Sequence, residues 1–265
     1  MNNARCTDDG VIYSALEFSR QLSSDLEIKR RFLQCPACGG PAFFRHASPI
    51  GRSACFGARP HAQGCQLAAQ EFADENQEEK LIHGRRIVVD FGYGSPTRPE
   101  SFFGSRQPDP MQEGAGRKHD QLHGHIYHRR VGSLLRTLIE YPTFGNSDLI
   151  VDIEGRGEAP ARNVFQPLES ATHHFSGYFR GYWGVISDAK LAPDNSLWLN
   201  SGGNDNISFC LDSQFVDVII KRYGIEDLED IAGAYILVFG TPRVSQNGKL
   251  FCVVEDINLM ALRLT

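Results

Sequence analysis

Apolar and polar side chains alternate in the C-terminal third of the chain, and this alternation predicts β-strands. The runs that carry the pattern are residues 178–187, 195–200, 207–211, 234–240 and 249–257. The tripeptide Gln246-Asn247-Gly248 separates the last two runs and predicts a hairpin turn. This part of the chain is therefore expected to be mostly β.

One helix is expected within this series of strands. Apolar residues recur at helical spacing over residues 214–223, and Gly224 follows as a helix stop. Three strands, a helix and two strands is the element order of an OB-fold, and residues 176–265 resemble that fold in this order. The resemblance implies a five-stranded Greek-key barrel. An SH3-like barrel or another kind of α+β domain is the alternative.

The remaining sequence divides into three regions. Residues 1–91 contain a cysteine-rich stretch and are expected to form a zinc-finger domain. Residues 92–127 are rich in proline, glycine and polar side chains, which is typical of a flexible linker or loop. Residues 128–175 begin with an amphipathic helix at 128–139 and are expected to be a helical connecting region. The predicted fold class is α+β and mostly β, with an N-terminal zinc-finger module and the OB-like barrel.

Composition and charge exclude some classes of protein. The 265 residues include 27 basic and 32 acidic side chains, and residues 176–265 carry 7 of the basic and 11 of the acidic ones. Nucleic-acid binders are usually basic, so any basic groove must be local. The apolar runs are too short to span a membrane, and the N-terminus lacks the pattern of a signal peptide. The 7 cysteines, an odd number, fit a reducing cytoplasm.

The cysteine-rich stretch has a spacing that implies a definite chemistry. Cys35 and Cys38 form a C-x2-C pair followed by two glycines, a knuckle that directs two thiolates at one metal. His61 and Cys65 form an H-x3-C pair that completes a tetrahedral set, so we predict a structural Zn2+. Cys55 could replace His61 or could simply be buried. Unrelated buried or disulfide-bonded cysteines are the alternative.

The same stretch resembles the zinc finger at the start of the competence-protein CoiA-like family. The resemblance covers residues 15–66 and depends on Phe32-Leu-Gln-Cys35-Pro-Ala-Cys38-Gly-Gly and the later ligand pair. It implies a bacterial protein that acts on DNA, with a nuclease domain after the finger. The carboxylate-and-lysine set of such a nuclease has no match in the sequence, so only the finger is carried over.

The predicted barrel indicates where a ligand would bind. OB-folds bind single strands, oligosaccharides or proteins across the faces of strands two and three. Trp198 lies opposite the core-facing Leu197 and Leu199, so we expect it on that face, where a base would stack for about 1–3 kcal/mol. The candidate nucleic-acid-binding residues are Arg180, Trp183, Trp198, Asn200, Lys249 and Phe251. Packing of both tryptophans against the middle of the chain is the alternative.

A histidine-rich segment at residues 119–128 is a second candidate site. His123 and His125, with Asp120 and Tyr127, would suit metal-dependent cleavage of a phosphodiester. Their spacing fits neither the single-strand nicking enzymes nor an HNH nuclease. A P-loop, a dinucleotide fingerprint and a nucleophile elbow are absent from the sequence.

These patterns predict an accessory protein rather than an enzyme. We expect a Zn2+-containing subunit that binds nucleic acid, with single-stranded DNA and a protein as partners, in a bacterial DNA-processing or defence system. A protein–protein adaptor that docks a nuclease or helicase is one alternative, favoured by the acidic C-terminal region. A metal-dependent nuclease that uses the histidines of residues 119–128 is the other.

Overall fold

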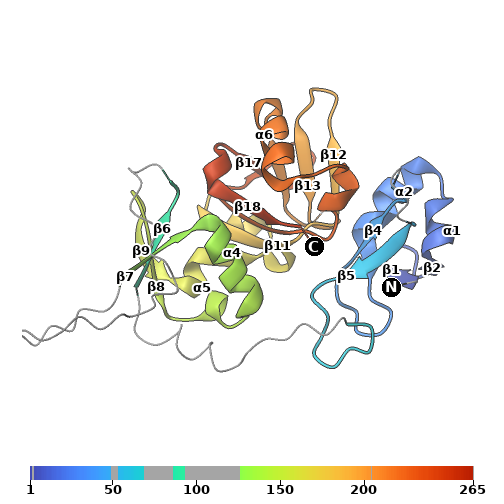
Figure 1. Ribbon diagram of the computed structural model, residues 1–265, viewed down its shortest axis with the longest axis horizontal. Helices are drawn as coiled ribbons and strands as arrows, with labels where there is room; N and C mark the ends of the chain where they lie inside the picture. Colours follow the sequence, from blue (N-terminus) through green and yellow to red (C-terminus); the bar gives the residue numbers. More distant parts are fainter. Residues whose placement is uncertain (2, 49–52, 69–85, 93–125, 204, 265) are drawn as a thin grey trace, which may run out of the picture.

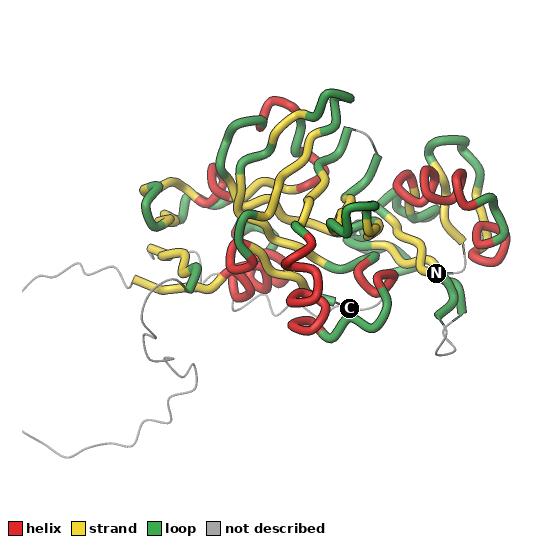
Figure 2. The backbone as a smooth tube through the Cα atoms, turned by 90° about the horizontal axis from the view of Figure 1, so that it is seen from above, coloured by secondary structure: helices red, strands yellow, loops and turns green. Residues whose placement is uncertain are grey.

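The computed structural model describes residues 1, 3–48, 53–68, 86–92, 126–203 and 205–264. These residues form a mixed α+β protein that is mostly β. A cysteine-rich N-terminal module and a middle sheet lie on opposite sides of the C-terminal sheets (Figures 1 and 2). No helix in this described part is long and apolar enough to cross a membrane.

The N-terminal module combines short strands with two short helices around an aromatic core. Its elements are β1 (Asn3–Cys6), β2 (Ile12–Ser14), α1 (Ala15–Ser19), α2 (Ser23–Lys29), η1 (Arg30–Phe32), β3 (Leu33–Gln34), β4 (Ala42–Arg45) and β5 (Cys55–Ala58). The order β2-β1-β3 makes one sheet, and β4 pairs with β5. Ser14 and Glu17 form a capping box that starts α1. Phe18 then packs between Phe44 and Phe56, with ring centroids 5.0 and 5.4 Å away.

The middle sheet has the order β7-β6-β8-β9, and β6 runs parallel to both β7 and β8. Its elements are β6 (Arg86–Asp90), β7 (Ile126–Arg130), α4 (Val131–Glu140), β8 (Ile150–Ile153), β9 (Gly157–Pro160) and α5 (Ala161–Val164). The helix expected at 128–139 begins later because its first residues continue β7. Residues 128–175 therefore contain strands as well as helices. Runs as short as that of β8 carry too few residues for a period of two to be detected.

The C-terminal part contains two sheets with a shared core. One has the order β10-β11-β15-β18, and the other has the order β12-β13-β14-β17-β16. Their strands are β10 (Phe165–Pro167), β11 (Arg180–Val185), β12 (Asp188–Leu191), β13 (Leu197–Asn200), β14 (Ser208–Leu211), β15 (Tyr235–Gly240), β16 (Arg243–Val244), β17 (Leu250–Val254) and β18 (Met260–Arg263). Tyr182, Leu199, Phe209 and Val238 are among the fully buried side chains between them.

The predicted order of strands and helix is present, but the described strands do not close into a barrel. The helix α6 (Ser213–Tyr223) begins after Asp212, whose carboxylate caps it, and ends at Gly224 with a φ of 62°. The barrel stays open because β15 pairs with β18 and β17 pairs with β16, so β15 and β17 form no ladder with each other. The turn at Gln246-Asn247-Gly248 joins β16 to β17 rather than β15 to β17.

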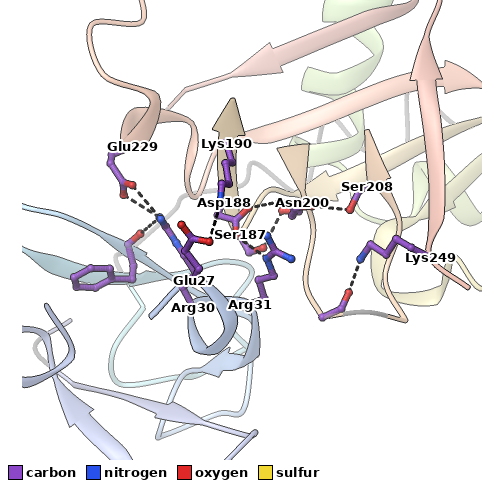
Figure 3. A network of polar contacts seen from close by, with 12 residues as sticks. Glu27, Arg30, Arg31, Ser187, Asp188, Lys190, Asn200, Ser208, Glu229 and Lys249 are labelled. Atoms are coloured by element: carbon purple, nitrogen blue, oxygen red, sulfur yellow. Dashed lines mark hydrogen bonds and ion pairs between the residues drawn. The ribbon is translucent and has the colours of Figure 1, made fainter. Parts of the chain in front are cut away.

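An arginine ion pair joins the N-terminal module to the C-terminal sheets. Arg30 donates from both terminal nitrogens to the carboxylate of Glu229, at 3.0 and 2.8 Å, and one of them also donates to the carbonyl of Phe44 at 3.0 Å (Figure 3). Glu229 lies in η5 (Leu228–Ile231). Burial raises the pKa of Glu229, but Arg30 lowers it further, and the net pKa lies below the ordinary value. The carboxylate therefore stays ionised beside its partner.

Two phenylalanines of the module pack onto glycines of the C-terminal part. A Cβ at Gly233 would lie 2.2 Å from the ring of Phe43, and a Cβ at Gly203 would lie 2.4 Å from the ring of Phe32. A side chain at either glycine would displace the ring. The two parts are therefore packed as closely as a protein core at these points.

Replacing Arg30 by alanine is expected to lower the free energy of unfolding by roughly 2–3 kcal/mol, because the Glu229 side chain, which is only 18% exposed, would lose its cation. Denaturant titration measures this change. Arg20→Ala, at an exposed arginine of the same module, is the control and should shift stability by less than about 0.5 kcal/mol. An equally small shift for Arg30→Ala would contradict this account.

Candidate functional site

Two hydrogen-bonded turns bring the predicted metal ligands together. In the first, the amide of Gly39 donates to the carbonyl of Cys35 at 2.9 Å, and Gly39 has a φ of 73° that favours glycine. In the second, the amide of Cys65 donates to the carbonyl of Ala62 at 3.1 Å. A Cβ at Gly40 would lie 2.5 Å from the carbonyl oxygen of Pro60. The glycine pair thus lets the two turns approach each other.

The four donor atoms are arranged as a metal would require. The Sγ atoms of Cys35, Cys38 and Cys65 and a ring nitrogen of His61 all lie within 4.8 Å of one another. The Cys35 and Cys65 sulfurs are 3.9 Å apart, and the Cys38 sulfur is 3.4 Å from Nδ1 of His61. A zinc tetrahedron with bonds of about 2.3 Å to sulfur and about 2.0 Å to nitrogen has edges of about 3.5–3.8 Å. The group can therefore hold a metal ion, and its donor set fits zinc.

The surroundings of the four ligands shift the pKa values of Cys38 and Cys65 in opposite directions. Backbone amides of Ala62 and Gly40, with the ring of His61, lower the pKa of Cys38 to about 6. Burial raises the pKa of Cys65. A bound divalent cation would stabilise both as thiolates. Cys55 lies in β5 opposite Arg45, outside this group, so the structure brings His61 rather than Cys55 to the other three ligands.

A cavity of about 690 Å3 lies on the outer face of β13 and β14, between the β12–β13 turn and the β16–β17 turn. We call it the groove. Ala192 and Pro193 line it from the first turn, and Asn247 and Gly248 line it from the second. Trp198, Asn200 and Lys249, all predicted from the sequence, also line it. The groove is large enough for a nucleotide.

Trp198, which lines the groove, forms an aromatic pair with Phe251. Trp198 is half-buried, and its ring centroid lies 5.9 Å from that of Phe251 at an interplanar angle of 45°. Phe251 comes from β17, two strands away from β13 in the sheet. The contact restricts the indole, so the ring can accept a planar group with little further loss of freedom.

A buried polar network includes Asn200 and Ser208, which line the groove. Asp188 accepts hydrogen bonds from the amide of Asn200 and from Nε of Arg31, the latter at 2.9 Å. Ser208 donates to Oδ1 of Asn200 at 2.7 Å (Figure 3). Asn200 is 5% exposed, and its amide oxygen and nitrogen are both used within the protein. Its place is therefore in the wall of the groove, as a structural residue.

Lys249 reaches the groove from the end of the β16–β17 turn. Its ammonium group donates to the carbonyl of Gly203 at 2.7 Å. Burial, and then the positive charge of Arg31, lower its pKa to about 8. Lys249 is therefore mainly protonated at neutral pH and loses its charge in mildly alkaline solution.

The other two predicted binding residues lie elsewhere. Trp183 is on β11, in the other sheet, and packs against the cluster that contains α4 and the middle sheet. Arg180 donates to the carbonyl of Asn163 and lies 5.3 Å from the ring of Phe175. Neither lines the groove, and Phe251 does not line it either, although it contacts Trp198. Trp183 was expected to extend the surface that presents Trp198, but the two residues belong to different sheets.

Sequence reasoning missed two basic residues of the groove. Lys190 comes from β12, a strand that was not predicted, and pairs with Glu27 at 2.7 Å. Arg31 comes from η1 in the N-terminal module. No local pattern connects Arg31 with a site on distant strands. The histidines expected to form a second site, His119, His123 and His125, lie outside the described residues.

Comparisons with known proteins assign no family. No family model and no curated protein matches this sequence, so the resemblance to the CoiA-like family is not confirmed. The crystal structure of Schizosaccharomyces pombe Pot1pC bound to single-stranded DNA is similar over 38% of this chain and 86% of its own, with 13% identity and a TM-score of 0.27. A protein described as an aspartyl-tRNA synthetase from Leishmania major Friedlin is similar over 38% of this chain and 21% of its own, with 9% identity and a TM-score of 0.26.

The purified protein is expected to contain about one zinc ion per chain, the content of a closed four-ligand site. Cys38→Ser and His61→Ala should lower the metal content measured by mass spectrometry, because each removes one of the four ligands. Cys55→Ser is the matched control and should keep the metal. A full metal content in Cys38→Ser, or a loss in Cys55→Ser, would refute the ligand assignment.

Proposed function

We propose that this protein is a zinc-containing accessory subunit that binds single-stranded nucleic acid, most readily DNA, in the groove of an OB-like unit at residues 176–265. The observation that carries the proposal is the groove itself. It lies on the second and third strands of the unit, between the two turns that OB-folds use for oligonucleotides. The order of strands and helix around it supports the same assignment.

Stacking would supply most of the binding energy. Trp198 contacts Phe251 and lines the groove. A base that stacks on such a ring contributes about 1–3 kcal/mol whatever its sequence. Single strands expose these faces, whereas a duplex buries them, so the groove favours single strands.

Charge would contribute less. Arg31, Lys190 and Lys249 line the groove, but Arg31 and Lys190 each have a carboxylate partner and Asp205 also lines it. Few phosphates can therefore be neutralised. For one or two phosphates, log K would fall with log salt concentration with a slope of about −0.7 to −1.4.

The metal centre would act structurally. Zinc at Cys35, Cys38, His61 and Cys65 would fix the two turns that follow η1 and β5, and no position would remain for a substrate. A DNA-processing or defence assembly, with a protein partner, is the setting that we infer for such a subunit.

A protein adaptor is the second candidate function, because the N-terminal module exposes several large apolar side chains. They are Val11, Ile12, Leu16, Leu22 and Ile28. Exposed apolar groups of this size are typical of protein-binding surfaces. Failure of the groove to bind any nucleic acid at low salt would favour this function.

Trp198→Ala is expected to weaken binding of single-stranded DNA by roughly ten- to a hundredfold, since one stacked base is lost. Fluorescence anisotropy with labelled single-stranded and duplex DNA and RNA, at two salt concentrations, measures this effect. Tyr178→Ala removes an aromatic ring that is 54% exposed and does not line the groove, so it is the control. Equal affinities for wild type and Trp198→Ala would refute the stacking site.

Binding is also expected to weaken as pH rises through about 8, where Lys249 loses its proton. The loss of one charge-assisted hydrogen bond should lower affinity by roughly tenfold between neutral and alkaline pH. Lys249→Arg stays charged over this range and should give a flat profile. An identical decline in wild type and Lys249→Arg would assign the pH dependence to another group.

A further inference from the structure

The N-terminal module reaches one end of the groove. The sheet has the order β12-β13-β14-β17-β16, so β12 is its edge strand on that side. The module meets this edge at two ion pairs, and a second cavity of about 410 Å3 lies between α2 and β12. Glu27 of α2 pairs with Lys190 at 2.7 Å, and Arg31 of η1 pairs with Asp188 at 2.9 Å. A strand that crosses the sheet from β17 through β14 and β13 would therefore meet α2 and η1 when it reaches β12.

Arg31 stands where the groove ends. Its Nε atom donates to Asp188, whose other carboxylate oxygen accepts from Asn200 (Figure 3). Asp188 is 3% exposed, so this contact fixes the guanidinium group firmly. Among the described residues, the two terminal nitrogens of Arg31 have no hydrogen-bond partner, and the residue lines the cavity. They are free to donate to a ligand.

The form of the ligand follows from this position. We propose that the groove holds the end of a single strand, and that Arg31 binds its terminal phosphate. This inference rests on the proposed function. A terminal phosphate monoester carries about −1.5 to −2 charges at neutral pH and has three acceptor oxygens, more than a phosphodiester within the strand. The fork of an arginine matches it with two parallel hydrogen bonds.

The balance of charges agrees with a strand end. The two other cations of the groove, Lys190 and Lys249, are close enough to line the same cavity. A track for a long strand would need a series of unpaired cations, whereas Lys190 is already paired with Glu27. One arginine fork beside one aromatic platform matches a terminal nucleotide, with its base on Trp198 and its phosphate on Arg31.

Strand ends can be tested directly with the full chain. The probes are single strands of about ten nucleotides, within the site size of an OB-fold, that carry a 5′-phosphate, a 3′-phosphate or hydroxyls only, and the same sequence as a circle. One phosphorylated end is expected to bind about tenfold more tightly than the hydroxyl-ended strand and the circle. The two phosphorylated probes identify which end is bound. Arg31→Ala should remove this preference, so that the phosphorylated, hydroxyl-ended and circular probes then bind with similar affinities.

Control variants separate binding from folding. Arg31→Ala leaves Asp188 buried without its cation, so Arg31→Ala combined with Asp188→Asn is measured beside it, and Arg20→Ala serves as the charge control. A circle that binds as tightly as the phosphorylated strand would overturn the inference and leave the proposed function in place. Persistence of the end preference in both Arg31 variants would also overturn it. Absence of binding to every probe would overturn both proposals.

Discussion

The arrangement of this protein depends on one buried guanidinium group. Arg30 is 6% exposed, and a charge at that depth is tolerated only with a partner. Its partner, Glu229, comes from η5, and its carbonyl acceptor comes from Phe44 in β4. Three segments of the chain must therefore meet at one point. The position of η1 against the C-terminal sheets follows from this meeting.

The positions of both candidate sites depend on the contact between Arg30 and Glu229. The residue after Arg30 is Arg31, which reaches the groove, and Cys35 follows only a few residues later as the first metal ligand. On the other side of the module, β4 carries the Phe44 carbonyl and pairs with β5. Residues of the metal group and of the groove thus lie on one continuous segment that contains η1 and β3.

Sequence patterns predicted the features that depend on neighbouring residues and missed the contacts between residues far apart in the chain. Alternation located β13 and β14, helical spacing with Gly224 located α6, and the cysteine spacing identified a group that the structure brings together. These signals depend on neighbours in the chain. The parallel pairing of β14 with β17, and the lack of a ladder between β15 and β17 that leaves the barrel open, depend on residues far apart. Arg30 and Glu229 are 199 residues apart, and no periodicity predicts such a pair.

The rings of Phe32 and Phe43 occupy the space that a side chain would fill at Gly203 and Gly233. The same ring of Phe43 also lies over Gly57, where a Cβ would be 2.2 Å away, so it is enclosed between glycines of both parts. Truncation at the boundary between the parts would remove both rings and expose these glycines and the face of β12 to water. A shortened protein that begins near residue 176 would thus lack these rings and the ion pairs that Arg30 and Arg31 form with Glu229 and Asp188. The N-terminal module and the C-terminal sheets should therefore be expressed and crystallised together.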